Sequence, residues 1–423
     1  MKMKIGALIV VAATAAATHA GSDAGRRFEW TTQSAEAKKL IAEVQARIEN
    51  FQGGGKETQA LAQKLVAADP KFAMGTYYLS VVMPGDEGLK LYEQSRELAK
   101  TASDGERRFI EGVVHVRLNQ GADFAKSIEP LEALAKDYPG ERLVWMILGQ
   151  LYNGDGKGDK ARAAFEKAQA IGPRSPRADA FLAGDEILQG RYEKARAIYQ
   201  SVEKTLPKGA VPFAVRFGVT FSHLYEQNVD AALESLKTYL AEYRAGGLDQ
   251  QFPEVFILNA MARINLENGR TKEAMALYEQ GYKSVPASQL SENEKKTWLG
   301  RLHHGKARTL ARMGKTEEAW AEAETVKKMI EDGGDAGKQF WPAYHYLAGY
   351  VKLEAGEYDK AIEHLKQADA DDPFHTLLLA RAYDKAGKKD DARATYEKVV
   401  ASQAQNLERA LAYPEAKKRL QAS

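Results

Sequence analysis

The chain has 423 residues, of which 44% are hydrophobic and 28% are charged. Its 60 basic and 58 acidic residues nearly cancel, which argues against nucleic acid as a partner, because binding a phosphate backbone requires a net or clustered positive field. The sequence contains no cysteine, which excludes disulfides, thiolate metal sites and cysteine nucleophiles, and suits an oxidising compartment.

The N-terminus has the pattern of a secretory signal peptide. Two lysines precede an uncharged run over residues 5–18, and Thr18 and Ala20 place small residues at the two positions that a signal peptidase reads. Because this run is shorter than the ~20 residues needed to cross a bilayer, cleavage is favoured over an uncleaved membrane anchor. We therefore predict a signal peptide over residues 1–20 and an exported protein, periplasmic or, alternatively, secreted.

Residues 21–141 show a weak pattern of helix pairs, interpreted as divergent versions of the repeats that follow. The expected helices cover residues 35–50 and 57–68, 72–83 and 88–102, and 106–119 and 123–137. A loop of three glycines beginning at Gly53 separates the first two helices. Ser103 and Glu106 have the spacing of a capping box at a helix start, as do Ser291 and Glu294.

Residues 142–403 carry a pattern in which a glycine is followed five residues later by an alanine. The pairs are Gly156/Ala161, Gly190/Ala195, Gly269/Ala274, Gly314/Ala319, Gly356/Ala361 and Gly387/Ala392, and a further unit is centred on Ala232. The glycine suits the turn that ends one helix, and the alanine lets the second helix approach the first closely. Each helix pair leaves an apolar face that its neighbour must cover, so we predict an all-α stack of antiparallel pairs.

One unit identifies the type of repeat. The chain has Trp145, Leu148, Gly149, Tyr152, Ala161, Phe165, Ala168 and Pro173, which match the tetratricopeptide signature W-x2-L-G-x2-Y…A-x3-F…P. Ala195, Tyr199 and Pro207 repeat the last part of this signature 34 residues later. The chain thus resembles exported bacterial tetratricopeptide repeat (TPR) proteins, and the resemblance implies a right-handed superhelical solenoid.

The end of the chain and three interruptions complete the predicted layout. Wider spacings between repeats predict longer helices or loops near residues 244–254, 287–297 and 331–341. Residues 404–423 are expected to form a C-terminal capping helix, because the last repeat would otherwise expose apolar surface.

Binding is expected on the concave face, which the first helix of each pair lines in repeat proteins of this type. Residues four apart share one stripe of a helix, and the aligned stripe runs through Met146/Gln150, Ala180/Gly184, Phe217/Phe221, Asn259/Arg263, His304/Arg308, Tyr346/Tyr350 and Leu377/Arg381. Its first half is small or apolar and its second half is polar. The candidate partner-binding residues are therefore Asn259, Arg263, His304, Arg308, Tyr346, Tyr350 and Arg381.

Arginines, an asparagine and tyrosines on one stripe suit a carboxylate ligand, because guanidinium donors match carboxylate geometry. Asn259, Arg263 and Arg308 resemble the carboxylate clamp by which some tetratricopeptide domains hold a peptide C-terminus, whereas His304 departs from it. The alternative interpretation is that these are groove-edge side chains paired to nearby glutamates. The pair Phe217/Phe221 is either a hydrophobic subsite or inter-repeat core.

Four patterns resemble catalytic or metal sites without completing one: Gly53–Lys56, Asn153–Asp159, His303 with His304, and His223 with Glu226. Gly53–Lys56 lacks the spacing of a phosphate loop, and Asn153–Asp159 lacks the bidentate glutamate of a calcium loop. His303 and His304 lack the HExxH spacing, and His223 with Glu226 lacks a third metal ligand. We therefore expect no catalytic residues, no cofactor and no metal.

The predicted function is an exported, non-catalytic scaffold that holds a partner in its groove and serves the assembly of an envelope complex. The expected partner is a protein or peptide with a free carboxylate or an acidic segment, with no nucleic acid and no membrane span after signal cleavage. The first alternative is a binder of a small anionic ligand or glycan in a closed pocket at Tyr346, Tyr350 and Arg381. An enzyme built into the superhelix is the less favoured alternative.

Overall fold

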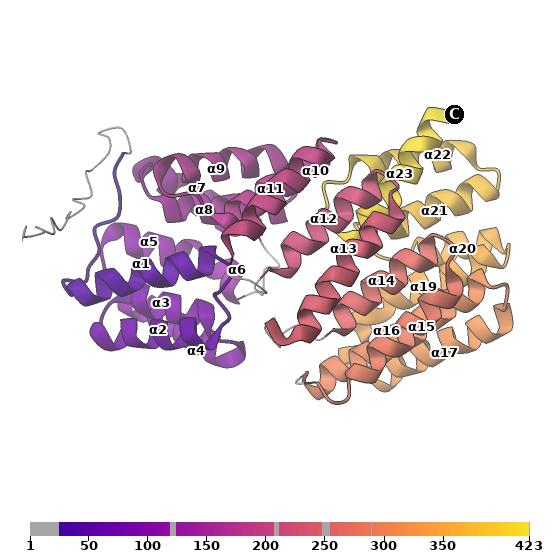
Figure 1. The fold of residues 1–423 in the computed structure, drawn as a ribbon, viewed down its shortest axis with the longest axis horizontal. Helices are drawn as coiled ribbons and strands as arrows, with labels where there is room; N and C mark the ends of the chain where they lie inside the picture. Colours follow the sequence, from indigo (N-terminus) through magenta and orange to yellow (C-terminus); the bar gives the residue numbers. More distant parts are fainter. Residues whose placement is uncertain (1–24, 119–123, 207–210, 248–253, 289, 423) are drawn as a thin grey trace, which may run out of the picture.

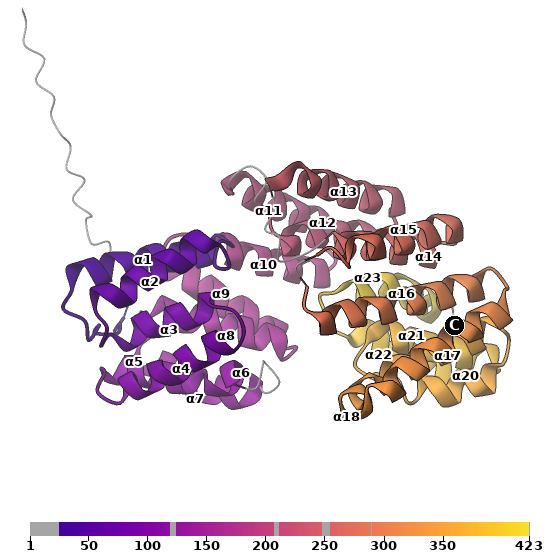
Figure 2. The ribbon, with the colours of Figure 1, turned by 90° about the horizontal axis from the view of Figure 1, so that it is seen from below.

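The computed structural model describes residues 25–118, 124–206, 211–247, 254–288 and 290–422, and all regular structure in these ranges is helical. The predicted signal peptide, residues 1–20, lies outside the described residues, as does the repeat proline Pro207. The helices form antiparallel pairs that stack in chain order into an elongated solenoid (Figures 1 and 2). The all-α solenoid expected from the sequence is therefore confirmed.

Three helix pairs precede residue 141. Their helices are α1 (Ala35–Glu49) with α2 (Lys56–Ala68), α3 (Ala73–Val82) with α4 (Gly85–Ala99), and α5 (Asp104–Gly112) and α6 (Val114–Leu118) with α7 (Phe124–Asp137). These bounds lie within a few residues of the expected ranges, except that the helix expected over 106–119 is interrupted at Val113.

Glu106 anchors the segment before α1 to the third helix pair. Ser103 caps α5 by accepting the backbone N–H of Glu106 at 3.4 Å, as the capping-box spacing predicts. The Glu106 carboxylate does not complete the box, because it accepts the backbone N–H and the hydroxyl of Thr31 at 2.8 and 2.6 Å. Burial raises the pKa of Glu106, and the bonds from Thr31 oppose that rise. A full capping box forms at Ser291.

Seven helix pairs follow, and some are longer than the basic repeat. They are α8 (Arg142–Gly154) with α9 (Gly158–Ile171), α10 (Pro176–Leu188) with α11 (Tyr192–Thr205), α12 (Phe213–Tyr225) with α13 (Val229–Glu242), α14 (Val255–Glu267) with α15 (Thr271–Ser284), α16 (Glu292–Arg312) with α17 (Thr316–Asp332), α19 (Trp341–Glu354) with α20 (Tyr358–Leu365), and α21 (Pro373–Lys385) with α22 (Lys389–Ala401). The wide spacings correspond to the 21-residue α16 and the 17-residue α17, and to the short elements η1 (Tyr243–Gly247), α18 (Gly334–Gly337) and η2 (Lys338–Phe340).

The turn between the two helices of a repeat explains the glycine of the sequence pattern. All six turn glycines have positive φ, namely Gly156 (69°), Gly190 (74°), Gly269 (78°), Gly314 (76°), Gly356 (80°) and Gly387 (76°). A side chain is strained in this left-handed region, whereas glycine adopts it freely. The repeat centred on Ala232 has no glycine here, and Gln227 takes the left-handed conformation instead, with φ of 58°.

The alanine of the pattern lies between the paired helices. Ala161, Ala195, Ala274, Ala361 and Ala392 are each at most 4% exposed, as predicted. Gly149 of α8 marks another close approach, because a Cβ atom on it would lie 2.6 Å from the ring of Phe165 on α9. The repeat signature thus follows from how closely the two backbones pack.

The last helix, α23 (Leu407–Ala422), turns back from the end of the stack. It packs against α22 and α21 and, across the groove, against α12 and α14. Figures 1 and 2 show this yellow helix among helices that precede it by up to two hundred residues. The concave face of the C-terminal repeats is therefore covered in part by the chain's own C-terminus.

Candidate functional site

The polar half of the predicted stripe comes together on the concave side of α14, α16 and α19. Arg308 donates from its two terminal nitrogens to the hydroxyls of Tyr346, at 2.9 Å, and Tyr278, at 3.1 Å. The guanidinium of Arg263 lies 5.8 Å from the centre of the Tyr346 ring. We call Arg263, Arg308, Tyr278 and Tyr346 the arginine–tyrosine cluster. Three of its four members were predicted from the stripe, and Tyr278 comes from the second helix of a pair.

A second layer lies one helical turn further along the same stripe. Arg312 donates to the Tyr350 hydroxyl at 2.9 Å and to the Glu267 carboxylate at 2.8 Å. It also lies 3.1 Å from the carboxylate of Glu354. Arg312 and Glu267 were not predicted, although each follows a candidate arginine by four residues and so shares its face. Tyr350 is fully buried, and its hydroxyl is hydrogen-bonded to Arg312 within this layer.

Arg263 is buried without a full set of partners. Arg263 is 9% exposed, and two of its guanidinium nitrogens, Nε and Nη2, are buried and make no hydrogen bond. The nearest carboxylates are those of Glu267, at 3.6 Å, and Glu408 of α23, at 4.0 Å. Both distances exceed the 2.7–2.9 Å of a charge-assisted hydrogen bond. Since an unsatisfied buried donor costs about 1–3 kcal/mol, Arg263 is a group prepared for a further acceptor.

Two histidines flank the arginine–tyrosine cluster, and they add no positive charge to that of the arginines. His304 stacks near Tyr346, with ring centres 5.0 Å apart, and bonds through Nε2 to the carbonyl of Ala343. Burial and the neighbouring Arg308 hold the pKa of His304 well below its usual value. His375, 4.0 Å from the Tyr346 ring centre, has a pKa lowered to about 4 by burial and by Arg263. Both imidazoles are therefore neutral at pH 7.

The remaining two candidates lie at the edges of this group. Asn259 is half-buried one turn before Arg263, and it lines a small cavity with Tyr278 and Trp298. Arg381 lies on α21 and makes a two-pronged contact with Glu415 of α23, with 2.9 Å for one of the two bonds. Burial alone would raise the pKa of Glu415, but the contact with Arg381 keeps this pKa below its usual value. The carboxylate expected from a partner is thus supplied here by the chain itself.

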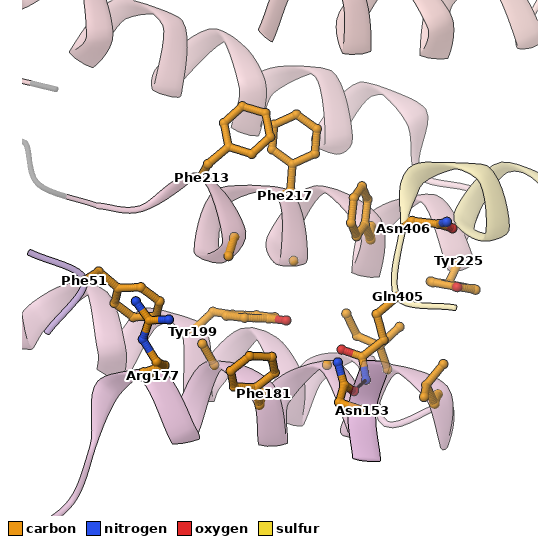
Figure 3. A pocket seen from close by; sticks show the side chains of 17 residues that line it. Phe51, Asn153, Arg177, Phe181, Tyr199, Phe213, Phe217, Tyr225, Gln405 and Asn406 are labelled. Carbon is orange, nitrogen blue, oxygen red and sulfur yellow. Dashed lines mark hydrogen bonds between the residues drawn. The ribbon is translucent and has the colours of Figure 1, made fainter. Parts of the chain in front are cut away.

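Four residues from the first half of the stripe line an aromatic pocket between α10 and α12 (Figure 3): Ala180, Gly184, Phe217 and Phe221. The pocket has a volume of about 340 Å³ and is lined by these aromatic side chains: Phe51, Phe181, Tyr199, Phe213, Phe217, Phe221 and Tyr225. Ala180 and Gly184, the stripe residues of α10, are small and line its floor. The side chain of Gln405 packs directly on Gly184, where a Cβ atom would clash with it. Phe217 and Phe221 therefore contribute to a cavity wall as well as to packing.

Segments far apart in sequence close the two ends of the aromatic pocket. At one end Arg177 of α10 donates to the carbonyl of Ile48 at 3.2 Å and lies over the ring of Phe51, 5.0 Å from its centre. At the other end Gln405 donates to the side chain of Asn153 at 3.1 Å. Figure 3 shows these polar groups at opposite ends of the aromatic walls. Tyr225, which also lines the pocket, accepts a hydrogen bond from Arg409 of α23 at 2.7 Å.

The patterns that resembled catalytic or metal sites have structural roles. Residues 53–56 form the turn that leads into α2, and residues 155–157 the turn between α8 and α9. His303 bonds to Glu322 at 2.5 Å, and Glu226 is paired with Arg196. Within the described ranges, no three or more histidine or acidic side chains gather where they could hold a metal ion.

TPR repeats are recognised in two parts of the chain. Tetratricopeptide repeat family models match residues 115–176 and 155–210, and a further such model matches residues 352–413. No curated protein matches the chain. In the described part, no helix combines the length and the apolar character needed to cross a membrane.

Solved structures resemble the chain at low sequence identity. A Rap protein complexed with Competence and Sporulation Factor is 12% identical, with a TM-score of 0.53, and the match covers 92% of this chain and 98% of that one. A tetratricopeptide repeat protein from Parabacteroides merdae is 17% identical, with a TM-score of 0.47 over 66% and 98% of the two chains. PilW, a type IV pilus biogenesis factor, is 15% identical, with a TM-score of 0.41 over 56% and 98%. The likeness to the Rap protein concerns the fold alone.

Proposed function

We propose that the protein is a non-catalytic scaffold that binds a partner protein along its concave groove. Stacked helix pairs offer an extended curved surface, and TPR folds generally use such surfaces to bind proteins. We further propose that the chain is exported and works in the periplasm, or outside the cell, where it serves the assembly of an envelope complex. The signal-peptide pattern of residues 1–20 supports this location.

The observation that carries the proposed site is the unsatisfied guanidinium of Arg263. Arg263 is a buried cation with two donors that make no hydrogen bond, and the neutral His304 and His375 lie beside it. Glu408 of α23 approaches it to 4.0 Å. A carboxylate that approached Arg263 closely would satisfy both donors. We therefore propose that an acidic segment of the partner binds at Arg263, among the candidate residues Asn259, Arg263, His304, Arg308, Tyr346, Tyr350 and Arg381. At Arg381 a carboxylate of the partner would have to replace Glu415 of α23.

The aromatic pocket supplies an apolar subsite in the same groove. Its walls can accept aliphatic or aromatic side chains of the partner, because burying such a side chain stabilises a complex by roughly 1.5–3 kcal/mol. Arg177 stands at one end of the pocket with a single hydrogen bond to a carbonyl. The proposed partner segment therefore combines apolar side chains, held near Phe217 and Phe221, with acidic ones held near Arg263.

A protein segment fits this site better than a small anionic ligand or glycan. The hydroxyls of Tyr346 and Tyr350 are bound by Arg308 and Arg312, so they are not free to hold sugar hydroxyls. The cationic and aromatic parts lie on successive repeats and not around one closed cavity. A ligand that contacts both must be long, as an extended peptide or a helix of a partner protein is.

The proposed site is tested by affinity capture from a cell-envelope extract. The bait is the chain without residues 1–20, compared with Arg263→Met, which removes the charge and keeps most of the side-chain volume. Arg393→Met is the matched control, because Arg393 is 57% exposed on α22. We expect one protein to be retained by the native chain and by the control and to be lost with Arg263→Met. Equal retention by all three would refute the assigned site.

A further inference from the structure

The C-terminal helix α23 occupies the proposed groove in the manner of a ligand. Glu408 and Glu415, seven residues apart and so on one face of the helix, point toward Arg263 and Arg381. Ala410 and Ala412, between the two glutamates, and Ala416, directly after the second, are buried. The helix thus presents carboxylates and an apolar face to the same residues that are proposed to receive a partner.

The fit of α23 is incomplete on both sides. A cleft of about 670 Å³ lies between α23 and α12, α13, α14 and α21, and a second of about 340 Å³ lies toward α19 and α22. Both clefts are lined by Arg381 and Glu415, so they flank the ion pair. The fully buried apolar residues of α23 are alanines, which remove little apolar area from water compared with leucine. Its larger apolar side chains are only partly buried against the core: Leu407, Leu411, Tyr413 and Leu420. The groove therefore has room for a bulkier helix.

The two glutamates of α23 are also paired unequally with the arginines of the groove. Arg381 is bound by Glu415 through two hydrogen bonds, whereas the Glu408 carboxylate stops 4.0 Å short of a terminal nitrogen of Arg263. Pro414 lies inside α23 and cannot donate the helical hydrogen bond to Ala410, which weakens the helix in its middle. The contact between α23 and the groove is therefore weaker at Arg263 than at Arg381.

We infer that the groove between α12, α14 and α21 is a helix-binding groove, and that α23 is its built-in, displaceable occupant. The partner is an amphipathic helix with two carboxylates seven residues apart and with side chains larger than alanine between them. This inference rests on the proposed function and specifies the partner's chemistry. Because the groove is free only while α23 is undocked, the apparent affinity for a partner is reduced by the undocked fraction.

The test uses the full-length chain and a labelled peptide with the sequence of residues 404–423 as the probe. Glu408→Gln combined with Glu415→Gln removes both carboxylates of the resident helix and keeps its size. Glu397→Gln is the matched control, since Glu397 is exposed on α22 and paired with Arg393. We expect the double variant to bind the probe about tenfold tighter than the native chain and the control, a coupling of the usual allosteric size. A probe with both glutamates replaced by glutamine should bind the double variant more weakly.

Hydrogen exchange on the native chain supplies a second, independent readout that needs no variant. We expect the amides of α23 to exchange at least about tenfold faster than those of α21, because undocking opens α23 alone. Equal exchange of α23 and α21, together with equal probe binding by the native chain and the double variant, would overturn the inference and make α23 a fixed part of the core.

The two proposals fail in different ways. If capture of the envelope partner depends on Arg263 while α23 does not exchange and the probe does not bind, the scaffold function stands and the displaceable helix is refuted. If the probe exchanges with α23 while Arg263→Met leaves capture unchanged, the assigned partner site is refuted and the groove remains a helix-binding groove.

Discussion

The turn between α12 and α13 offers a substitution that should stabilise the protein. Gln227 has φ of 58°, whereas the equivalent position in six other repeats is a glycine with φ between 69° and 80°. A non-glycine residue in this left-handed conformation costs about 1–2 kcal/mol. Replacing it with glycine removes that strain but adds back about 0.4–1 kcal/mol of chain entropy in the unfolded state. We therefore expect Gln227→Gly to stabilise its repeat by a net ~0.5–1 kcal/mol.

The assay is hydrogen exchange of α12 and α13 amides, because it reports local stability in a stack whose repeats need not unfold together. Gln227 is exposed and makes no side-chain hydrogen bond among the described residues, so little else is lost with it. Gln200→Gly is the control, since Gln200 is exposed in the interior of α11 and glycine there should cost about 1 kcal/mol. A Gln227→Gly variant that exchanges faster than the native chain would refute the strain argument.

Three further predictions concern packing, pH and the groove. Ala195→Arg should unfold at least its own repeat, seen as a loss of helical circular dichroism, whereas Ala392→Arg near the end of the stack should do less damage; equal effects would contradict a repeat-by-repeat stability. The depressed pKa of His375, about 4 when folded against ~6.5 when unfolded, means that only the unfolded chain takes up this proton as the pH falls from 6.5 to 4. About 3 kcal/mol of stability should therefore be present above pH 6.5 and lost by pH 4, and denaturant unfolding of His375→Asn should show a correspondingly flatter pH profile. Phe221→Ala should lower the affinity for the captured partner at least about tenfold and should lower the melting temperature less than Phe217→Ala, because Phe221 lines the pocket but is only partly buried; an unchanged affinity would remove the pocket from the site.

The repeats themselves could be predicted from sequence because their determinants are local. The turn glycines, the buried alanines and the signature residues of the 145–173 unit act within one helix pair, and the structure places them as expected. The inward stripe followed from helix periodicity alone, so Arg263, Arg308 and Tyr346 were found together. Gln227 shows the limit of the pattern, because the backbone there keeps its conformation without the glycine.

The parts that sequence reasoning missed depend on contacts between distant repeats. The helix α23 must return across the groove to pair Arg381 with Glu415 and Tyr225 with Arg409. The path of α23 is set by the small rotation that accumulates at each repeat. The closure of the aromatic pocket by Phe51 joins residues more than a hundred positions apart for the same reason. A charge spacing of seven residues in the last helix was the available signal, although it does not say which surface that helix meets.

The central claim is that a partner protein binds in the concave groove, and site-specific photo-crosslinking tests it most directly. A photoreactive phenylalanine analogue at Phe221, on the pocket wall, is compared with the same analogue at Glu397, on the exposed face of α22. After irradiation in a cell-envelope extract, we expect one protein to be attached to the chain from position 221 and none from position 397. Crosslinks from position 397 alone would contradict the account and place the binding surface outside the groove.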